Sequence, residues 1–131
     1  MKEKEPVWVL RETVLLLHEE SLVEHGGSTG IRDEGMLDSA LGKPLNHFSY
    51  GAPAVFDLAA SYAIGIVKNH PFIDGNKRTG FVTATLFLEL NGHSFHATEV
   101  DAAIRTLALA AGEMTEAEYS AWLEANSTPP A

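Results

Sequence analysis

Apolar residues recur along most of this chain at spacings of three and four, which is the period of an amphipathic α-helix. The first such stretch runs from about Trp8 to Glu24, and its apolar stripe consists of Leu10, Val14, Leu17, Leu22 and Val23. Gly26-Gly27 is expected to end this helix. A shorter helix is expected from Asp33, a favourable N-cap residue, to Leu41, with Gly42 and Pro44 ending it.

Two longer helices are predicted in the middle of the chain. The first covers about 54–69 and is expected to end at His70-Pro71, because proline disfavours helical geometry in the residue before it. The second begins near Gly75 or Asn76 and runs to Leu90, with Asn91-Gly92 as its C-terminal signal. Its apolar residues cover nearly every side, so it is expected to be the central, buried helix.

Two more helices are predicted in the last third of the chain. Thr98 is expected to cap a helix that ends at Gly112, and the predicted buried side of that helix consists of Val100, Ile104, Leu107 and Ala108. Thr115 and Glu118 have the spacing of a capping box at the start of the last helix. Residues 126–131 are expected to form a disordered tail.

The segment Pro44–Pro53 interrupts the helical pattern with two prolines and a glycine, and it is predicted to be a loop or a short hairpin. No convincing run of alternating strand residues is found elsewhere. The pattern therefore predicts an all-α fold: a single domain over residues 1–131, built as a compact bundle around one buried helix, with a small flap before that helix.

Composition and charge narrow the function classes. The chain has 131 residues, with nine Lys and Arg against 18 Asp and Glu, which gives a net charge of −9. This balance disfavours nucleic acid and anionic membranes as partners. The absence of cysteine excludes disulfides and thiol nucleophiles and fits a cytoplasmic protein. The longest apolar stretch, Ala52–Val67, is too short to span a bilayer.

The segment His70–Arg78 carries the candidate chemistry. A buried helix is predicted to start here, so its first backbone N–H groups have no partners within the helix. Lys77 and Arg78 add two positive charges, and Lys68 is a third candidate. Gly75 permits close approach of a ligand to the backbone. These features together predict a pocket that binds phosphate.

Two further side chains extend that interpretation. Asp74 fits beside a phosphate site if a magnesium ion lies between them, since carboxylates and phosphates bind this ion together. His70 can accept a proton near neutral pH. Taken singly, His70 or Asn76 is explained as a helix cap, and Lys77 and Arg78 as a solvated face. In combination they favour phosphoryl or nucleotidyl transfer.

The same stretch resembles the signature of the Fic/Doc superfamily, His-Pro-Phe-x-Asp/Glu-Gly-Asn-x-Arg, and every fixed position is present in His70–Arg78. The chain length and the order of the predicted helices resemble the smaller, death-on-curing (Doc) branch. Ile31–Leu41 is also similar to the upstream segment of that branch, and the flap before the core helix has a counterpart there.

This resemblance implies a nucleotide-dependent transferase that uses ATP and Mg²⁺. It implies that His70 is the catalytic base, that Asp74 holds magnesium and that Lys77 also takes part in catalysis. It implies that Asn76 and the backbone amides orient phosphate and that Lys77 and Arg78 bind the phosphates of the nucleotide. With Gly75 and Lys68 from the charge and backbone pattern, the expected phosphate-binding set comprises Gly75, Asn76, Lys77, Arg78 and Lys68. It also implies that the flap aligns the target segment as an added strand, with the residues Phe48, Ser49, Tyr50 and Gly51.

The resemblance leaves two reactions open. AMP-transferring members have Gly at the position of Lys77 and a second arginine at the position of Phe81, whereas the run Asn76–Thr79 is similar to the Doc type, which transfers a phosphate. Pro71 and Gly75, however, are typical of the AMP-transferring type. We expect a Doc-like toxin that phosphorylates a protein Ser or Thr, by resemblance in elongation factor Tu, and AMP transfer is the alternative.

Fewer residues bear on regulation and on the other function classes. The Doc branch implies an antitoxin protein as partner. Ser120 and Glu124 have the spacing of an inhibitory motif in some Fic proteins, although Ala125 fills its Gly/Asn position. A catalytically inactive module that binds a nucleotide or a partner is an alternative of another class, and a nucleic-acid-binding bundle conflicts with the charge of −9.

Overall fold

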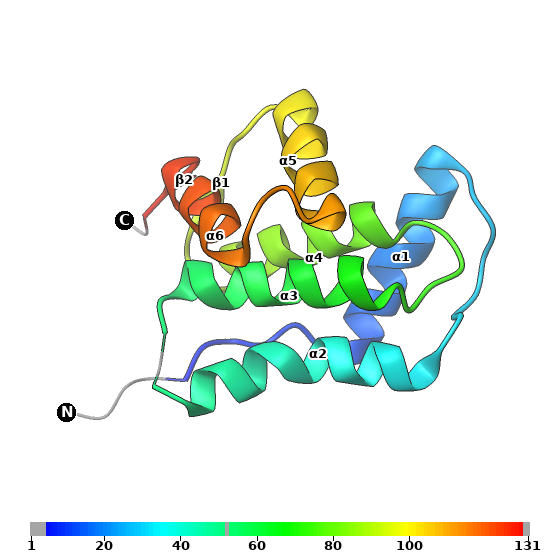
Figure 1. Ribbon diagram of the computed structural model, residues 1–131, viewed down its shortest axis with the longest axis horizontal. Helices are drawn as coiled ribbons and strands as arrows, with labels where there is room; N and C mark the ends of the chain where they lie inside the picture. The colour runs from blue at the N-terminus through cyan, green and yellow to red at the C-terminus, as the bar shows by residue number, and fades with distance from the viewer. Residues whose placement is uncertain (1–4, 52, 130–131) are drawn as a thin grey trace.

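The computed structural model describes residues 5–51 and 53–129. These residues form six α-helices and two very short strands (Figure 1). In chain order the elements are α1 (Arg11–His25), α2 (Glu34–Ser49), α3 (Val55–Asn69), α4 (Asn76–Leu90), β1 (Ser94–Phe95), α5 (Glu99–Ala111), α6 (Glu116–Ala125) and β2 (Ser127–Thr128). The expected all-α fold is confirmed.

The central helix is α3, so the expectation that the helix over 76–90 is the central one is wrong. In Figure 1, α2 lies along one side of α3 and α5 and α6 lie along the other, while α4 packs against it from behind. Small residues such as Ala59, Ala60 and Ala63 are fully buried and let these neighbours approach closely. By contrast, Leu90 of α4 is 43% exposed.

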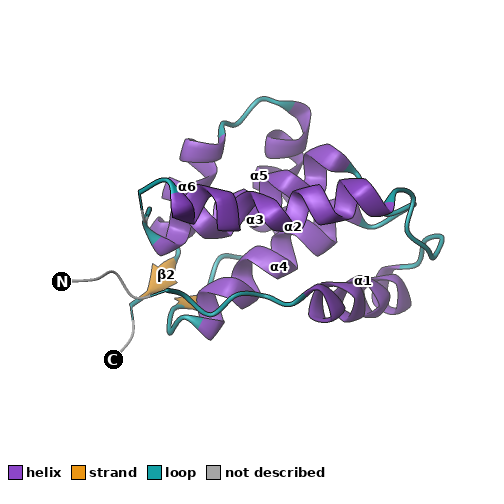
Figure 2. Ribbon diagram, turned by 90° about the horizontal axis from the view of Figure 1, so that it is seen from below, coloured by secondary structure: helices purple, strands orange, loops and turns teal. Residues whose placement is uncertain are grey.

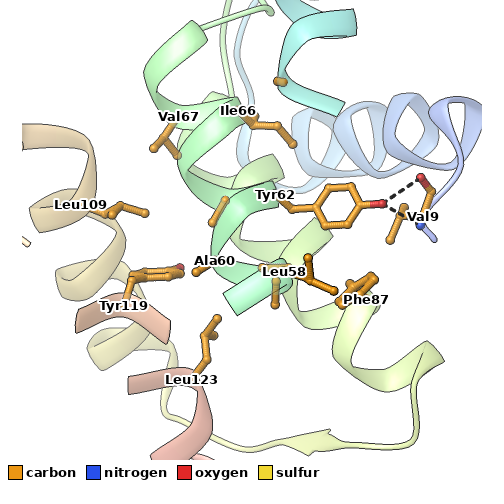
Figure 3. Close-up of a cluster of buried hydrophobic side chains, with 14 of the residues drawn as sticks. Val9, Leu58, Ala60, Tyr62, Ile66, Val67, Phe87, Leu109, Tyr119 and Leu123 are labelled. Carbon is orange, nitrogen blue, oxygen red and sulfur yellow. Dashed lines mark hydrogen bonds between the residues drawn. The ribbon is translucent and has the colours of Figure 1, made fainter. Parts of the chain in front are cut away.

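Buried aromatic side chains connect the layers of the bundle. Figure 3 shows Tyr62 pointing from α3 towards the segment before α1, where its hydroxyl accepts a hydrogen bond from the backbone N–H of Val9 at 3.0 Å. The ring of Phe87 in α4 packs beside it, 5.3 Å away between centroids. Burial raises the pKa of the Tyr62 hydroxyl. The extended N-terminal segment is thus tied to the core.

Helix α2 continues past Pro44 to Ser49. The predicted helix end at Gly42 and Pro44 is therefore wrong. The predicted loop or hairpin over 44–53 is also wrong for the described residues. Proline removes the N–H that would bond to the carbonyl of Ala40. The backbone of Gly65 in α3 lies directly against that carbonyl, since a Cβ at Gly65 would be 3.0 Å from the Ala40 oxygen. Tight packing of α2 on α3 therefore compensates for the missing hydrogen bond.

Helices α1 and α5 bury different faces from those predicted. In α1, Val14 is buried as expected, but Val23 is 87% exposed, and Leu10, the N-cap residue before the helix, is 58% exposed. In α5, the buried residues are Ala102, Thr106 and Leu109, and the expected core residues Val100, Ile104 and Leu107 are all more than half exposed.

A polar partner explains the buried threonine of α5. The hydroxyl of Thr106 lies 2.9 Å from the hydroxyl of Tyr119 in α6, so burial leaves neither group without a hydrogen bond. Burial raises the pKa of Tyr119 to about 12. The predicted cap of α5 is confirmed, because the Thr98 side chain accepts from the N–H of Asp101.

The C-terminal region is more ordered than expected. The capping box of Thr115 and Glu118 is present at the start of α6. After α6, the strand β2 pairs antiparallel with β1, and these strands appear in orange in Figure 2. The expected tail is thus wrong for 126–129, and residues 130–131 lie outside the described part. Across residues 5–51 and 53–129, none of the helices combines enough length and apolarity to cross a membrane.

Candidate active site

The signature segment forms the loop that joins α3 to α4. His70 is the C-cap of α3, its side chain is exposed, and it has a left-handed backbone with φ of 52° and ψ of 53°. A residue other than glycine in this region costs of order 1 kcal/mol and persists only when its surroundings hold it. Arg32 provides that hold. Its guanidinium donates to the carbonyl oxygens of His70 at 2.6 Å and Asn69 at 2.9 Å.

Asp74 is fixed by the segment that follows α1. Its carboxylate oxygen Oδ2 accepts a hydrogen bond from the backbone N–H of Ser28 at 2.8 Å. The adjacent Gly27 has a φ of +120°, and a Cβ there would be 3.2 Å from the Cβ of Asp74. Asp74 itself is exposed, so its carboxylate is held in place while it remains accessible from solvent.

Asn76 has a different role from the one that the resemblance implies. Its side chain is only 4% exposed, and both of its polar atoms bind the backbone of Phe72. The N–H of Phe72 donates to Oδ1, and Nδ2 donates to the carbonyl of Phe72, each at 2.9 Å. The Asn76 side chain therefore closes the loop on itself and is not directed at a phosphate.

His18 of α1 supports the loop from inside the protein, and sequence reasoning missed it. This side chain is 3% exposed and stacks on the ring of Phe72, with centroids 3.8 Å apart and planes 11° apart. Its Nε2 lies 2.8 Å from the carbonyl oxygen of Asp74. A carbonyl can only accept, so Nε2 carries the proton. The available signal was its position four residues after Val14, on the buried side of α1.

The start of α4 has the features expected of an anion site. Gly75 precedes the helix with φ of +81°, and no side chain from the described residues caps it. The first N–H groups of a helix without such a cap are free to bind an anion. Lys77 and Arg78 lie in this first turn, both exposed, and neither forms a salt bridge with another described residue.

Lys68 does not join this cation group. Its Nζ donates to the carbonyl oxygen of Ala110 at 3.1 Å, in the last turn of α5. A cation at the C-terminal end of a helix is favoured by the helix dipole. The interaction joins the ends of α3 and α5, so the expected phosphate-binding role of Lys68 is not supported by its position.

The predicted flap Phe48–Gly51 lies away from this loop. Phe48 and Ser49 end α2, next to the start of α3, whereas the loop follows the other end of α3 (Figure 1). The 15 residues of α3 separate those ends by roughly 22 Å at the usual helical rise. Phe48 packs edge-on against Trp8. The predicted target-positioning role of these residues therefore has no geometric basis.

The segment that does pair with the loop is Gly30–Asp33. Ile31 forms an antiparallel bridge with Phe72, and the N–H of Ile73 donates to the carbonyl of Gly30 at 3.1 Å. The carbonyl of Pro71 accepts from the N–H groups of Arg32 and Asp33 at 2.6 and 3.1 Å. This short ladder lies directly beside the site.

Two other candidates are placed elsewhere. Ser120 donates to the carboxylate of Asp57 at 2.8 Å, and Glu124 is exposed on α6 without a salt bridge to Arg78 in the described structure. An inhibitory motif of this kind would place Glu124 against the phosphate-binding arginine, and that contact is not formed in the described structure.

A magnesium ion fits this site only with ligands from a nucleotide. The described residues contain no cluster of three or more His, Cys, Asp or Glu side chains that could hold a metal. Asp74 offers a fixed, exposed carboxylate in the loop directly before the start of α4. This arrangement suits Mg²⁺, which is commonly held by one or two carboxylates together with phosphates and water.

The fold and the site define a class of all-α proteins in which a loop between two core helices carries an exposed histidine and leads into a cationic helix start. A model of the Fic/DOC family matches residues 8–88, which include α1 to α3, the loop and most of α4. The chain belongs to the Fic/DOC family.

Two relatives are similar to part of this chain. "Toxin Doc" of Mycolicibacterium smegmatis is 38% identical over 73 residues, which are 53% of this chain and 55% of that protein. "Protein kinase doc" of Escherichia phage P1 is 32% identical over 82 residues, 62% of this chain and 65% of that protein. The chain thus covers less than two thirds of the length of either relative.

Proposed function

We propose that this protein is a Doc-like toxin that transfers the γ-phosphate of ATP to a Ser or Thr hydroxyl of another protein. The observation that carries the proposal is the exposed His70 next to an α4 start that bears Lys77 and Arg78 and has no side-chain cap among the described residues. The names of the two relatives, a toxin and a protein kinase, support the same activity.

His70 acts as the general base in this proposal. Its imidazole accepts the proton of the target hydroxyl while the hydroxyl oxygen bonds to the γ-phosphorus and the bond between that phosphorus and the β–γ bridging oxygen breaks. A phosphorylated protein, ADP and one proton result. The Arg32 hydrogen bonds that fix the His70 backbone hold the imidazole in position for this step.

The start of α4 binds the phosphates. Free N–H groups, the helix dipole and the side chains of Lys77 and Arg78 stabilise the negative charge on the phosphate oxygens. Asp74 would hold Mg²⁺ against the same oxygens, and the bound ion would add charge neutralisation.

The target segment is proposed to lie beside the ladder of Gly30–Asp33 and Pro71–Ile73. Extended backbone already pairs there through Ile31 and Phe72. An added strand is a common way to hold a peptide, and here it would bring a hydroxyl next to His70. By resemblance, the target is elongation factor Tu, the inhibitor is an antitoxin protein, and both act in the cytoplasm.

AMP transfer is the second candidate because Gly75 and Pro71 are typical of AMP-transferring members. In that reaction the hydroxyl attacks the α-phosphorus and pyrophosphate leaves. The same base and the same helix start serve both reactions, so the position of the transferred label has to separate them. If the protein is a binding module without catalytic activity, no label is transferred.

The role of His70 is tested by His70→Ala in a transfer assay with labelled ATP and purified elongation factor Tu or a bacterial lysate. We expect at least a 100-fold loss of transfer, the usual contribution of a general base, with thermal stability unchanged because the side chain is exposed. His96→Ala is the matched control, since His96 is also exposed and lies outside the loop. Full activity of His70→Ala would remove this residue as the base.

A further inference from the structure

A cavity adjoins the anion site. A cavity of about 230 Å³ lies between α4 and α5, and Lys77 and Arg78 line it together with Phe81. Lys77 and Arg78 precede Phe81 by four and three residues, so the three side chains are neighbours on the helix surface. A ligand bound at the start of α4 can therefore extend into this cavity.

The walls of the cavity are largely apolar. Ala102 and Ala103 leave space on the α5 side, and Leu107, which is 54% exposed, lies along the same helix. Phe81 is held edge-on against Phe95, with ring centroids 5.7 Å apart. The cavity thus offers an aromatic ring in a fixed orientation, opposite small side chains.

One end of the cavity is acidic. Lys68 at the end of α3 bonds to Ala110, which places the end of α5 next to the signature loop. Glu99, in the first turn of α5, therefore lies on the side of the cavity far from the loop. A ligand that fills the space meets cations at one end and a carboxylate at the other.

We propose that this cavity binds the base of the nucleotide donor, with the ring stacked on Phe81. An exocyclic amino group, as in adenine, donates a hydrogen bond to the carboxylate of Glu99. Apolar walls do not suit a second phosphate, whereas a flat base with polar edges matches them. This inference rests on the proposed function and adds the location and the chemistry of the base to it.

The size of the cavity agrees with this assignment. Sites for whole drug-sized ligands measure roughly 300–1,000 Å³, and about 230 Å³ is smaller than that range. The space therefore accepts one end of a nucleotide while the phosphates remain outside, against Lys77 and Arg78. This geometry directs the terminal phosphate towards His70, as transfer of the γ-phosphate requires.

The test compares ADP with inorganic tripolyphosphate, a probe without a base, by calorimetric titration in the presence of Mg²⁺. Ala103→Leu fills the cavity from an exposed position, and Phe81→Ala removes the stacking ring. We expect each variant to weaken ADP binding about tenfold, the size of one base–aromatic stack, and to leave tripolyphosphate binding unchanged. Ile104→Ala is the control, because Ile104 is 58% exposed on α5 and does not line the cavity.

The possible outcomes separate this inference from the proposed function. Unchanged ADP affinity in Ala103→Leu, in a protein that still transfers phosphate, overturns the base site alone. Equal loss of ADP and tripolyphosphate binding also overturns it. A wild-type protein that neither binds ADP nor transfers a phosphate overturns both proposals. A preference for ADP over UDP that disappears in Glu99→Ala supports the predicted contact.

Discussion

At the scale of single residues, the site depends on contacts that hold the loop and not only on groups that face a ligand. His70 has a left-handed backbone, and Arg32 fixes it by two hydrogen bonds to neighbouring carbonyls. Asn76 closes the loop onto Phe72, and His18 stacks beneath it. Two of the signature positions, Asn76 and Gly75, thus serve loop geometry.

Variants of His18 test whether catalysis depends on contacts that hold the loop as well as on groups that face a ligand. His18→Phe keeps a ring to stack on Phe72 but removes the N–H that donates to the Asp74 carbonyl. We expect its kcat to fall about tenfold, the equivalent of one hydrogen bond, while KM for ATP stays unchanged because Lys77 and Arg78 are untouched. His18→Gln, which can still donate, should recover part of the rate if its fold is retained.

The control is His25→Ala, which removes an exposed histidine of the same helix. Thermal unfolding establishes that each variant is folded before its rate is compared. A His18→Phe variant that is folded and has the wild-type kcat would show that the hydrogen bond to Asp74 does not position the loop.

At the scale of elements, the sequence located some features well and others not at all. The bounds of α3 and α4 agree with prediction within one residue, because a strong apolar period is interrupted there by Pro71 and Gly75. Helix α2 extends past Pro44 because of its packing on Gly65, a contact that local propensity does not contain. In α5, two apolar faces compete, and the one with smaller residues is buried.

The residues that complete the site come from distant parts of the chain. His18 and Asp74 are 56 positions apart, and Ile31 pairs with Phe72 across 41 (72 − 31). A motif identifies the loop but does not identify what supports it. For the same reason the sequence predicts a flap at Phe48–Gly51, whereas the segment that lies beside the loop is Gly30–Asp33.

The capping box of α6 gives a prediction for acid stability. The carboxylate of Glu118 accepts the N–H of Thr115, which holds the pKa of Glu118 below its ordinary value. A lowered folded pKa stabilises the native state above the unfolded pKa of about 4.3 and loses this effect as the pH falls through the folded value. We expect Glu118→Gln to lower Tm slightly at pH 7 and to converge with wild type in acid.

Thermal unfolding at pH 7, 5 and 3.5 measures this effect. Glu124→Gln is the control, because Glu124 is an exposed glutamate of the same helix. If the Tm difference between Glu118→Gln and wild type stays constant over this pH range, the hydrogen-bonded carboxylate does not contribute as described.

At the scale of the whole molecule, an acidic protein presents a small cationic site. The net charge is −9, yet Lys77 and Arg78 are adjacent at a helix start that has no side-chain cap among the described residues. Positive potential is thus concentrated where phosphates are expected, and the rest of the surface disfavours polyanions. The six helices place the proposed base cavity, the anion site and His70 along one path from α5 to the loop.

The most direct test of this account is the position of the label that the protein transfers. ATP labelled at either the α- or the γ-phosphate is incubated with the protein, Mg²⁺ and elongation factor Tu, and the label on protein Ser and Thr is measured. If the protein is a Doc-like kinase, γ label alone is transferred and ADP is released in equal amount. Transfer of α label with release of pyrophosphate would contradict this function.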